Sequence, residues 1–304
     1  RVGSGALPLP RSAIARIARA AAIKLRIPCS SDFHTNFHSY SRHYGVGWLK
    51  KPIAAYLRKF HNRSGCTLVP TSALLKDLQA HGYLNLRVVA RGVDTHLFNP
   101  TRRSAALRRQ WGVTPEQPVA IYVGRLAPEK NLSVVLQAYA AMKKAHPDVR
   151  LVLVGDGPAR AALQAANPEF VFAGMRTGED LAMHYASGDV FLFPSTTETF
   201  GNVTIEAMAS GLAPIAYDYA AAAEHISHGR NGLVAQFNDA AEFIALAANL
   251  IGDRQRIARF GRCARESTRR IDWEEVHSEF ESALKDVIAN HARQTVDAGT
   301  CLST

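Results

Sequence analysis

Five short apolar runs decide the fold: VAIYVG (residues 119–124), LVLVG (151–155), FVFAG (170–174), DVFLFP (189–194) and APIAY (213–217). Each run has the length of a β-strand and is almost wholly apolar, which is typical of a parallel strand buried on both faces. Helix-length segments separate the runs or follow the last one, at about residues 131–145, 158–166, 179–187, 202–210 and 239–251. The alternation predicts an α/β fold with a doubly wound parallel sheet. Two further helices, at 253–268 and 272–290, are expected to close the chain.

The first part of the chain is less regular but has the same character. Its candidate strands lie near residues 28–33, 66–69 and 86–89, and its candidate helices at 11–26, 46–62 and 72–80. This pattern predicts half of a second α/β domain. Proline and glycine recur between Asn99 and Pro118, so we expect the domain boundary there. The predicted division is residues 1–111, residues 112–290 and a loose tail over 291–304.

Length and composition limit the class of protein. A chain of 304 residues, of which 47% are hydrophobic, suits two domains that each bury a core. No run approaches the roughly 18 to 20 consecutive apolar residues of a membrane span, and residues 1–10 lack the order of a signal peptide. The four cysteines are scattered without a CxxC pair, which indicates neither a disulfide framework nor a zinc site. We therefore expect a cytoplasmic protein.

Charge divides unevenly along the chain. Residues 1–111 hold 19 Lys and Arg against three Asp and no Glu, whereas the remainder holds 17 basic and 23 acidic side chains. A basic half attracts anionic partners such as lipid headgroups, a phosphorylated acceptor or nucleic acid. The expected helix over 46–62 is amphipathic and basic, which favours an anionic membrane surface. Solvated surface charge around a core-facing stripe is the alternative for both features, and no nucleic-acid motif accompanies them.

Two carboxylates eight positions apart, Glu198 and Glu206, form the strongest local signal, in the segment ETFGNVTIE. The segment follows the predicted strand 189–194 and opens a helix, so it belongs at the carboxyl end of the sheet. There the amides of residues 201–203 would form a helix N-terminus able to receive phosphate. Glu198 would face the ligand, and Glu206 could reach ribose hydroxyls because a carboxylate accepts two hydrogen bonds. The alternative is a helix with a favourable acid in its first turn and a merely exposed Glu198.

A second cluster, GRLAPEK, ends the predicted strand 119–124 and enters the next helix. Gly124 permits close approach of a ligand to the backbone, and the cations Arg125 and Lys130 could converge on a diphosphate and stabilise it as it leaves. Taken alone these cations would be ordinary surface charges. Their place at a strand end, opposite the Glu198 loop, favours the functional interpretation. No Asp-x-Asp pair occurs in the chain, so protein cations and helix amides would replace a metal ion at a bound diphosphate.

Other catalytic motifs are missing from the sequence. The turn VGDGP (154–158) lacks the third glycine of a dinucleotide site, because Arg160 stands in its place. No GxxxxGK[ST] loop, GxSxG elbow or HExxH pair occurs, which argues against a kinase, a hydrolase or a zinc protease. His34 follows the predicted strand 28–33, where it could donate to sugar hydroxyls or to the reacting oxygen. A structural histidine is the alternative.

Taken together, these segments resemble the retaining glycosyltransferase family 4, over about residues 11–290. The resemblance rests on motifs in one order along the chain: FHTNF (33–37), RGVDTHLFNP (91–100), VGRLAPEKNL (123–132), LVGDGP (153–158), FAG (172–174) and PSTTETFGNVTIEAMASG (194–211). It implies a GT-B fold, in which two Rossmann-like doubly wound domains face each other across a cleft. The segments FHTNFHSYSRHYG and RGVD are most similar to GDP-mannose-dependent α-mannosyltransferases and to sulfoquinovosyl transferases of glycolipid synthesis.

The resemblance assigns a role to each site residue. Arg125 and Lys130 would bind the donor diphosphate beside Gly124, and Glu206 would bind the ribose. The residues that would border the nucleobase are Gly174 and Met175. Those that would hold the transferred sugar are Glu198 and the backbone of Thr199, Phe200, Gly201, Asn202 and Val203. His34 would meet the donor sugar near the reaction centre, so the residues assigned to catalysis are His34, Arg125, Lys130 and Glu198.

The implied reaction moves a hexose, with mannose favoured, from GDP-mannose or a UDP-sugar to a hydroxyl of a lipid or glycan, with no metal or other cofactor. The acceptor hydroxyl would attack the face that the diphosphate leaves, and the departing diphosphate would take its proton. No protein nucleophile is then needed. A cytoplasmic enzyme, peripheral on the inner face of the plasma membrane, would suit a lipid acceptor.

The start of the chain departs from the family pattern. Family members begin with a strand and a glycine-rich loop on the acceptor side, and residues 1–10 do not resemble their approach to the next helix. We therefore expect a first domain that lacks its initial strands. The alternative function is that of an inactive truncated fragment or a sugar-nucleotide binding module.

Overall fold

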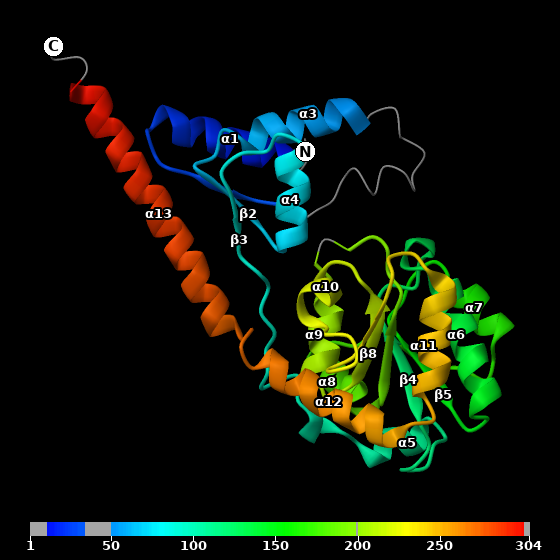
Figure 1. Cartoon of the computed structure of the whole chain (residues 1–304). Coiled ribbons are helices and arrows are strands. Elements are labelled where there is room, and N and C mark those ends of the chain that lie inside the picture. The colour runs from blue at the N-terminus through cyan, green and yellow to red at the C-terminus, as the bar shows by residue number, and fades with distance from the viewer. Residues whose placement is uncertain (1–10, 34–49, 199, 301–304) are drawn as a thin grey trace, which may run out of the picture.

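The computed structural model describes residues 11–33, 50–198 and 200–300, as two α/β units joined by a linker and by a long last helix (Figure 1). The larger unit is built on a six-stranded, wholly parallel sheet in the order β6-β5-β4-β7-β8-β9. Its strands are β4 Val119–Val123, β5 Arg150–Val154, β6 Val171–Gly174, β7 Val190–Phe193, β8 Ala213–Tyr217 and β9 Leu233–Ala235. The five strands predicted from the apolar runs are confirmed, and β9 is the additional one.

Helices cover both faces of this sheet, as doubly wound connections require. They are α6 Leu132–Ala145, α7 Arg160–Ala166, α8 Gly178–Ser187, α9 Asn202–Ala209, α10 Ala221–His225, α11 Ala240–Leu250 and α12 Arg254–Thr268. The α6 and α11 helices pack together on one face, while α8, α9 and α12 pack on the other (Figure 1). The core between the layers includes Tyr122, Tyr185, Phe191 and Phe243, which are completely or almost completely buried.

The winding of the chain reverses direction once in this sheet. It runs outward from β4 through β5 to β6, then returns to place β7 on the other side of β4. The loops that leave β4 and β7 therefore diverge to opposite faces, and sheets of this kind bind ligands between two such loops. We call the region between the β4 and β7 loops, at the carboxyl edge of the sheet, the crevice.

The smaller unit is a three-stranded parallel sheet in the order β1-β2-β3. Its elements are α1 Arg11–Lys24, β1 Ser30–Asp32, α3 Lys50–His61, β2 Cys66–Val69, α4 Ser72–Ala80 and β3 Leu86–Val88. One face of the sheet packs through Phe33, Val69, Leu78 and Tyr83, with Leu57 of α3 against them. The strands and helices predicted for this part are confirmed within a few residues, and α3 uses part of its apolar stripe to contact the core.

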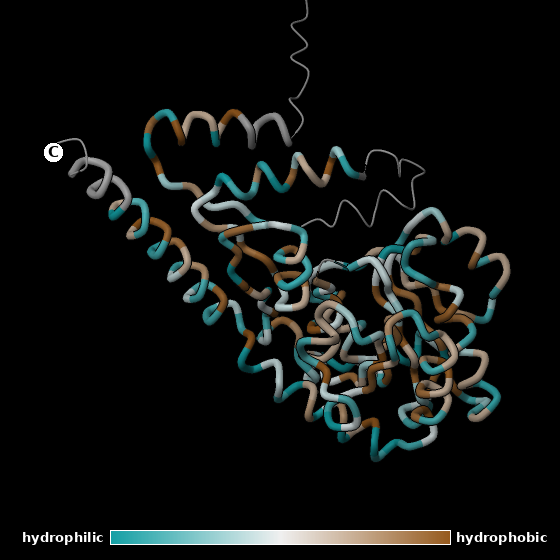
Figure 2. The backbone as a smooth tube through the Cα atoms, turned by 45° about the horizontal axis from the view of Figure 1, so that its top comes forward, coloured by the Kyte–Doolittle hydropathy of each residue, from teal (hydrophilic) through white to brown (hydrophobic). Residues whose placement is uncertain are grey.

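The last helix, α13 Trp273–Thr300, leaves the larger unit and crosses to the smaller one (Figure 1). Ala283 and Val287 pack against Cys66 and Leu68 of β2. Hydrophobic and hydrophilic residues alternate along α13, because only one stripe of the helix faces the sheet (Figure 2). The helix continues to Thr300, past the point where a loose tail was expected, and it covers the first sheet although its residues up to 290 were assigned to the second domain.

The linker between the two sheets packs with the larger unit. It contains a short 3-10 turn, Pro100–Arg102, and α5 Ala105–Gln110. Phe98, Trp111 and Val113 are buried in the same core cluster as β4. Residues from Val93 onward thus pack with the second sheet, whereas the sequence pattern predicted that residues up to 111 belong with the first.

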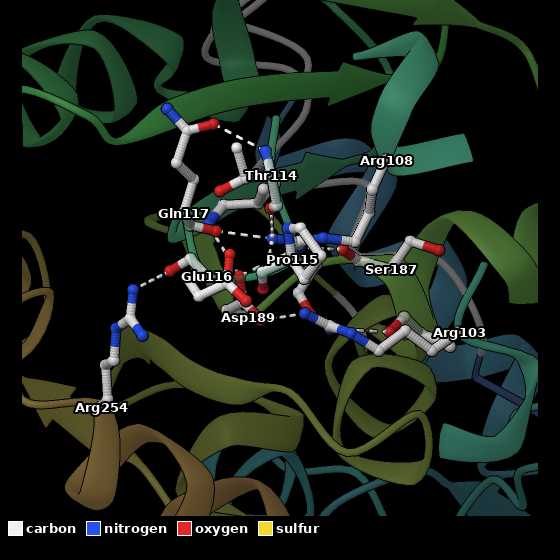
Figure 3. Close-up of polar contacts among 12 residues, drawn as sticks. Arg103, Arg108, Thr114, Pro115, Glu116, Gln117, Ser187, Asp189 and Arg254 are labelled. Atoms are coloured by element: carbon white, nitrogen blue, oxygen red, sulfur yellow. Dashed lines mark hydrogen bonds and ion pairs between the residues drawn. The ribbon is translucent and has the colours of Figure 1, made fainter. Parts of the chain in front are cut away.

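A buried ion pair fastens this linker to the amino edge of the larger sheet (Figure 3). The carboxylate of Asp189, just before β7, accepts hydrogen bonds from Arg103 at 2.7 Å, from Arg108 at 3.2 Å and from the Val119 amide at 2.8 Å. Arg108 also donates to the carbonyl groups of Ser187 and Gln117. Its side chain is only 4% exposed, and burial lowers the pKa of its guanidinium. Asp189 therefore holds β4, β7 and the linker together.

Replacing Asp189 with alanine should destabilise the fold strongly, because the buried Arg108 guanidinium would lose its carboxylate. We expect a loss of roughly 3 kcal/mol in the free energy of unfolding, measured by urea denaturation. Glu266→Ala is the matched control, since Glu266 forms an exposed pair with Arg269 and should change stability by less than about 1 kcal/mol. Equal losses in the two variants would contradict a structural role for the buried pair.

Candidate functional site

The candidate site lies at the carboxyl edge of the larger sheet, where backbone hydrogen bonds join the loops after β4, β5 and β6. The Gly124 amide donates to the Val154 carbonyl at 3.0 Å, and the Gly155 amide donates to the Gly174 carbonyl at 2.8 Å. Glycine is required at Gly155, where φ is +135° and a Cβ atom would overlap the Gly124 carbonyl oxygen. The close approach of these backbones brings the three loops to one level.

The loop after β4 is supported from below by Tyr122. This tyrosine is fully buried, and its hydroxyl donates to the Arg125 carbonyl at 3.1 Å. A Cβ atom at Gly124 would lie 2.9 Å from the same hydroxyl, so the ring and the loop are in direct contact. Burial raises the pKa of Tyr122, which keeps the hydroxyl protonated and able to donate. The ring thus sets the height and direction of the loop.

An ion pair spans the crevice between the loops after β4 and β7. Lys130, at the end of the 3-10 turn Pro128–Lys130, pairs with Glu198, and their side chains are 14% and 16% exposed. The Ser195 hydroxyl donates to the same Glu198 oxygen at 2.7 Å. On the β4 side, Arg125 pairs with Glu129, and the Arg125 side chain is about half exposed at 52%. The crevice therefore carries two cations and two carboxylates within one connected cluster.

The start of α9 adds backbone donors to this cluster. Gly201 precedes the helix with φ +93°, a conformation that favours glycine, and no described side chain caps the helix. The first amides of an α-helix have no intrahelical partner, so they can receive an anionic group. The cations of the β4 loop and the first turn of α9 thus border the same crevice.

Glu206 lies on α9, and its carboxylate is held by a buried tyrosine. The Tyr185 hydroxyl donates to Oε2 of Glu206 at 2.9 Å. Burial raises the pKa of the Glu206 carboxyl, and the hydrogen bond from Tyr185 lowers it. A partly buried carboxylate at this position can accept hydrogen bonds from vicinal hydroxyl groups.

The structure brings together most of the site residues proposed from sequence. These are Gly124, Arg125, Lys130, Glu198, Gly201, Asn202, Val203 and Glu206, with Gly174 on the same edge after β6. Met175 follows and is 68% exposed. The Phe200 side chain is buried and contacts His225, so its ring belongs to the interior. Thr199 and His34 lie outside the described residues, and their roles stay predictions.

Several supporting residues were missed by the sequence analysis. They are Tyr122, Glu129, Tyr185, Ser195 and Tyr219, whose hydroxyl donates to the Glu198 carbonyl at 2.7 Å. Ser195 could have been suspected because it stands three positions before Glu198 in a loop. The tyrosines carry no comparable signal, since each lies in a run of apolar or small residues or at the edge of one.

The two units contact each other near this edge. The carboxylate of Glu224, on α10 after β8, accepts a hydrogen bond at 2.8 Å from the Ser72 amide at the start of α4, which follows β2. The carboxyl ends of β2 and β8 therefore face each other across the boundary between the units. In the part of the chain that the structure describes, no group of three His, Cys, Asp or Glu could hold a metal ion, and no helix is long and apolar enough to cross a membrane.

Comparisons with known proteins identify the family of the chain. The family described as "Glycosyltransferase Family 4" matches residues 9–97, and the family "Glycosyl transferases group 1" matches residues 117–253. A GDP-mannose-dependent alpha-mannosyltransferase of Mycolicibacterium smegmatis is 36% identical over 86% of this chain and 67% of its own length. The sulfoquinovosyl transferase of Arabidopsis thaliana is 36% identical over 84% of this chain and 51% of its own. The chain belongs to glycosyltransferase family 4.

The solved structures define the architecture. Anabaena HepE in complex with UDP superposes with a TM-score of 0.77, covers 91% of this chain and 77% of its own, and is 22% identical. This likeness establishes the GT-B fold, and it confirms the fold predicted from the order of motifs. The chain spans about half to two thirds of the length of the curated relatives named above.

The close contact between Gly155 and the Gly124 carbonyl can be tested by adding a single methyl group. Gly155→Ala should force the Gly124 carbonyl away and cost roughly 2 kcal/mol or more, because overlap is added to backbone strain. Gly229→Ala is the control, since Gly229 has φ +76° but no atom within 4 Å of an added Cβ. Thermal unfolding should show the larger loss for Gly155→Ala, and a larger loss for Gly229→Ala would refute the close-contact explanation.

Proposed function

We propose that this protein is a retaining, metal-independent hexosyltransferase whose donor is a nucleotide-diphosphate sugar. The observation that carries the proposal is that the cations Arg125 and Lys130 lie at the same edge of the larger sheet as the uncapped first turn of α9. Cations and free helix amides are the groups that bind a diphosphate. Glu206 lies one turn further along α9, where its carboxylate would bind the ribose attached to that diphosphate. Glu198, held by Lys130 and Ser195, would contact the transferred sugar.

GDP-mannose is the proposed donor, with a UDP-sugar as the second choice. Relatives at 34% to 38% identity are named GDP-mannose-dependent alpha-mannosyltransferases, which favours guanine and mannose. The HepE structures contain UDP or UDP-glucose, which keeps uracil in consideration. The acceptor would be a hydroxyl group of a lipid or glycan. A cytoplasmic protein that touches an anionic membrane surface would fit a glycolipid acceptor, and no nucleic-acid partner is proposed.

The proposed reaction exchanges one bond of the anomeric carbon for another and moves one proton. The bond between the anomeric carbon and the diphosphate oxygen breaks, while the acceptor oxygen bonds to the same face of that carbon. The acceptor proton passes to the departing diphosphate, whose added negative charge Arg125 and Lys130 offset. His34 would contact the donor sugar near this carbon. No protein nucleophile takes part.

A sugar-nucleotide binding module without turnover is the second candidate. It is favoured by one observation: the donor-site residues Arg125, Lys130, Glu198 and Glu206 all belong to the larger unit. Binding of the nucleotide therefore needs no residue of the smaller unit. Turnover would require the smaller unit as well, because that unit would hold the acceptor.

Calorimetric titration with GDP-mannose, UDP-glucose and the free nucleotides, without added metal, tests the donor site. Lys130→Met should weaken binding about tenfold or more, because one charge-assisted hydrogen bond to the diphosphate is lost. Lys143→Met, on the exposed side of α6, is the control and should bind as the unmodified chain does. Selective binding, together with transfer of the sugar to an acceptor without hydrolysis of the donor, would support the enzyme. Binding without transfer would favour the binding module. A folded chain that binds none of these ligands would refute both candidates.

A further inference from the structure

We infer that Tyr185 is a positioning residue of the nucleotide site: its hydroxyl fixes one oxygen of Glu206, leaves the other for the ribose, and sets the lowest pH at which the nucleotide binds. This inference rests on the proposed function, because it assigns the Glu206 carboxylate to ribose hydroxyls. It concerns a residue of α8 that contacts no substrate itself.

The Tyr185 ring is held so firmly that its hydroxyl has one position. The residue is completely buried in the last turn of α8. Phe98 meets the ring edge-on with 5.7 Å between ring centroids, and Phe191 lies at 6.2 Å. A ring enclosed in this way cannot change rotamer without opening the core. The hydroxyl is therefore fixed relative to β7 and α9.

The two oxygens of the Glu206 carboxylate have different roles in the proposed site. Oε2 accepts the hydrogen bond from Tyr185 at 2.9 Å. Within the described part of the chain Oε1 accepts no hydrogen bond, so in the proposed site this oxygen is the one assigned to the ribose. A carboxylate anchored by one oxygen presents the other in a defined direction, which suits recognition of vicinal hydroxyl groups.

The surroundings of Glu206 make this single donor important. Burial disfavours the charged form and raises the pKa of the carboxyl, and the Tyr185 hydrogen bond is the influence that lowers it. The α9 helix holds no other charged residue. On the helices packed against it, Arg265 of α12 donates to the Ala209 carbonyl at 3.2 Å, and burial lowers the pKa of His225 on α10 and of His184 on α8. Behind Tyr185 lies Tyr122 of β4, and burial raises the pKa of both tyrosines, so both stay neutral. In the neighbouring loops, the charges of Lys130 and Glu198 are paired with each other.

The direction of the pH effect follows from these contacts. Ribose hydroxyls donate to the ionised carboxylate, so binding is present above the pKa of Glu206 and is lost as the pH falls through it. Without the Tyr185 hydroxyl the pKa of Glu206 rises. Binding should then fail at a higher pH. Well above that pH, affinity should fall only by the smaller amount that the lost orientation of the carboxylate costs.

The variant Tyr185→Phe removes the hydroxyl and keeps the buried ring. Affinity for GDP and for UDP would be measured by calorimetry from about pH 4 to about pH 9, a range that covers the ordinary and raised pKa values of a carboxyl group. We expect the midpoint of the acid loss of affinity to rise by about half to one pH unit, the equivalent of one buried hydrogen bond.

Two controls separate positioning from general structural damage. Tyr139→Phe removes another buried tyrosine hydroxyl of the same unit, which donates to the Val149 carbonyl at 3.3 Å, and it should leave the midpoint unchanged. Glu206→Gln should abolish this acid dependence of affinity. The double variant that carries Glu206→Gln and Tyr185→Phe should show no acid dependence either. An unchanged midpoint in folded Tyr185→Phe, or an equal loss of affinity at every pH, would overturn the inference.

A second readout keeps this test separate from the proposed function. If the unmodified chain binds neither nucleotide, the proposed function fails, but the contact between the two side chains can still be measured. The carboxyl carbon of Glu206, followed by NMR during a pH titration, should titrate at a higher pH in Tyr185→Phe than in the unmodified chain. Equal titration midpoints would show that Tyr185 does not control the carboxylate.

Discussion

The pairing of β4 with β7 is the constraint on which the candidate site depends. These strands lie side by side although two strands and three helices separate them along the chain. Because the connections on their two sides run in opposite directions, the loops that follow them part and leave a crevice. Lys130 and Glu198 come from these two loops and meet across it. With β4 and β7 apart, the same residues would be unrelated surface charges.

Polar groups of buried side chains support the crevice from the core of the larger unit. Tyr122 holds the carbonyl of the β4 loop, and Tyr185 holds the carboxylate on α9, each from a ring enclosed in the core. At the opposite edge of the sheet, the Arg108 and Asp189 pair fastens the amino ends of the same two strands. The strands that define the crevice are thus fixed at both ends by hydrogen bonds that burial makes costly to break.

The two units are joined by features far apart along the chain. The Glu224 carboxylate contacts the first amide of α4, and α13 returns from the end of the chain to cover the first sheet. Such contacts orient the carboxyl ends of both sheets toward each other. In the proposed reaction this arrangement would place an acceptor held by the smaller unit beside a donor held by the larger one.

The sequence by itself determined the strands, the fold class and the positions of most site residues, because continuous apolar runs and glycine-rich loops report the local environment of each segment. It placed Glu198 and Lys130 at strand ends, and the family motifs set them in order. Only the tertiary structure decided that α13 packs on the first sheet, that residues from Val93 pack with the second, and that Tyr122 and Tyr185 support the site. A tyrosine in an apolar run is predicted to be a core residue whether or not its hydroxyl forms a hydrogen bond. Sequence does not show the acceptor of that bond, because folding brings it near from another segment.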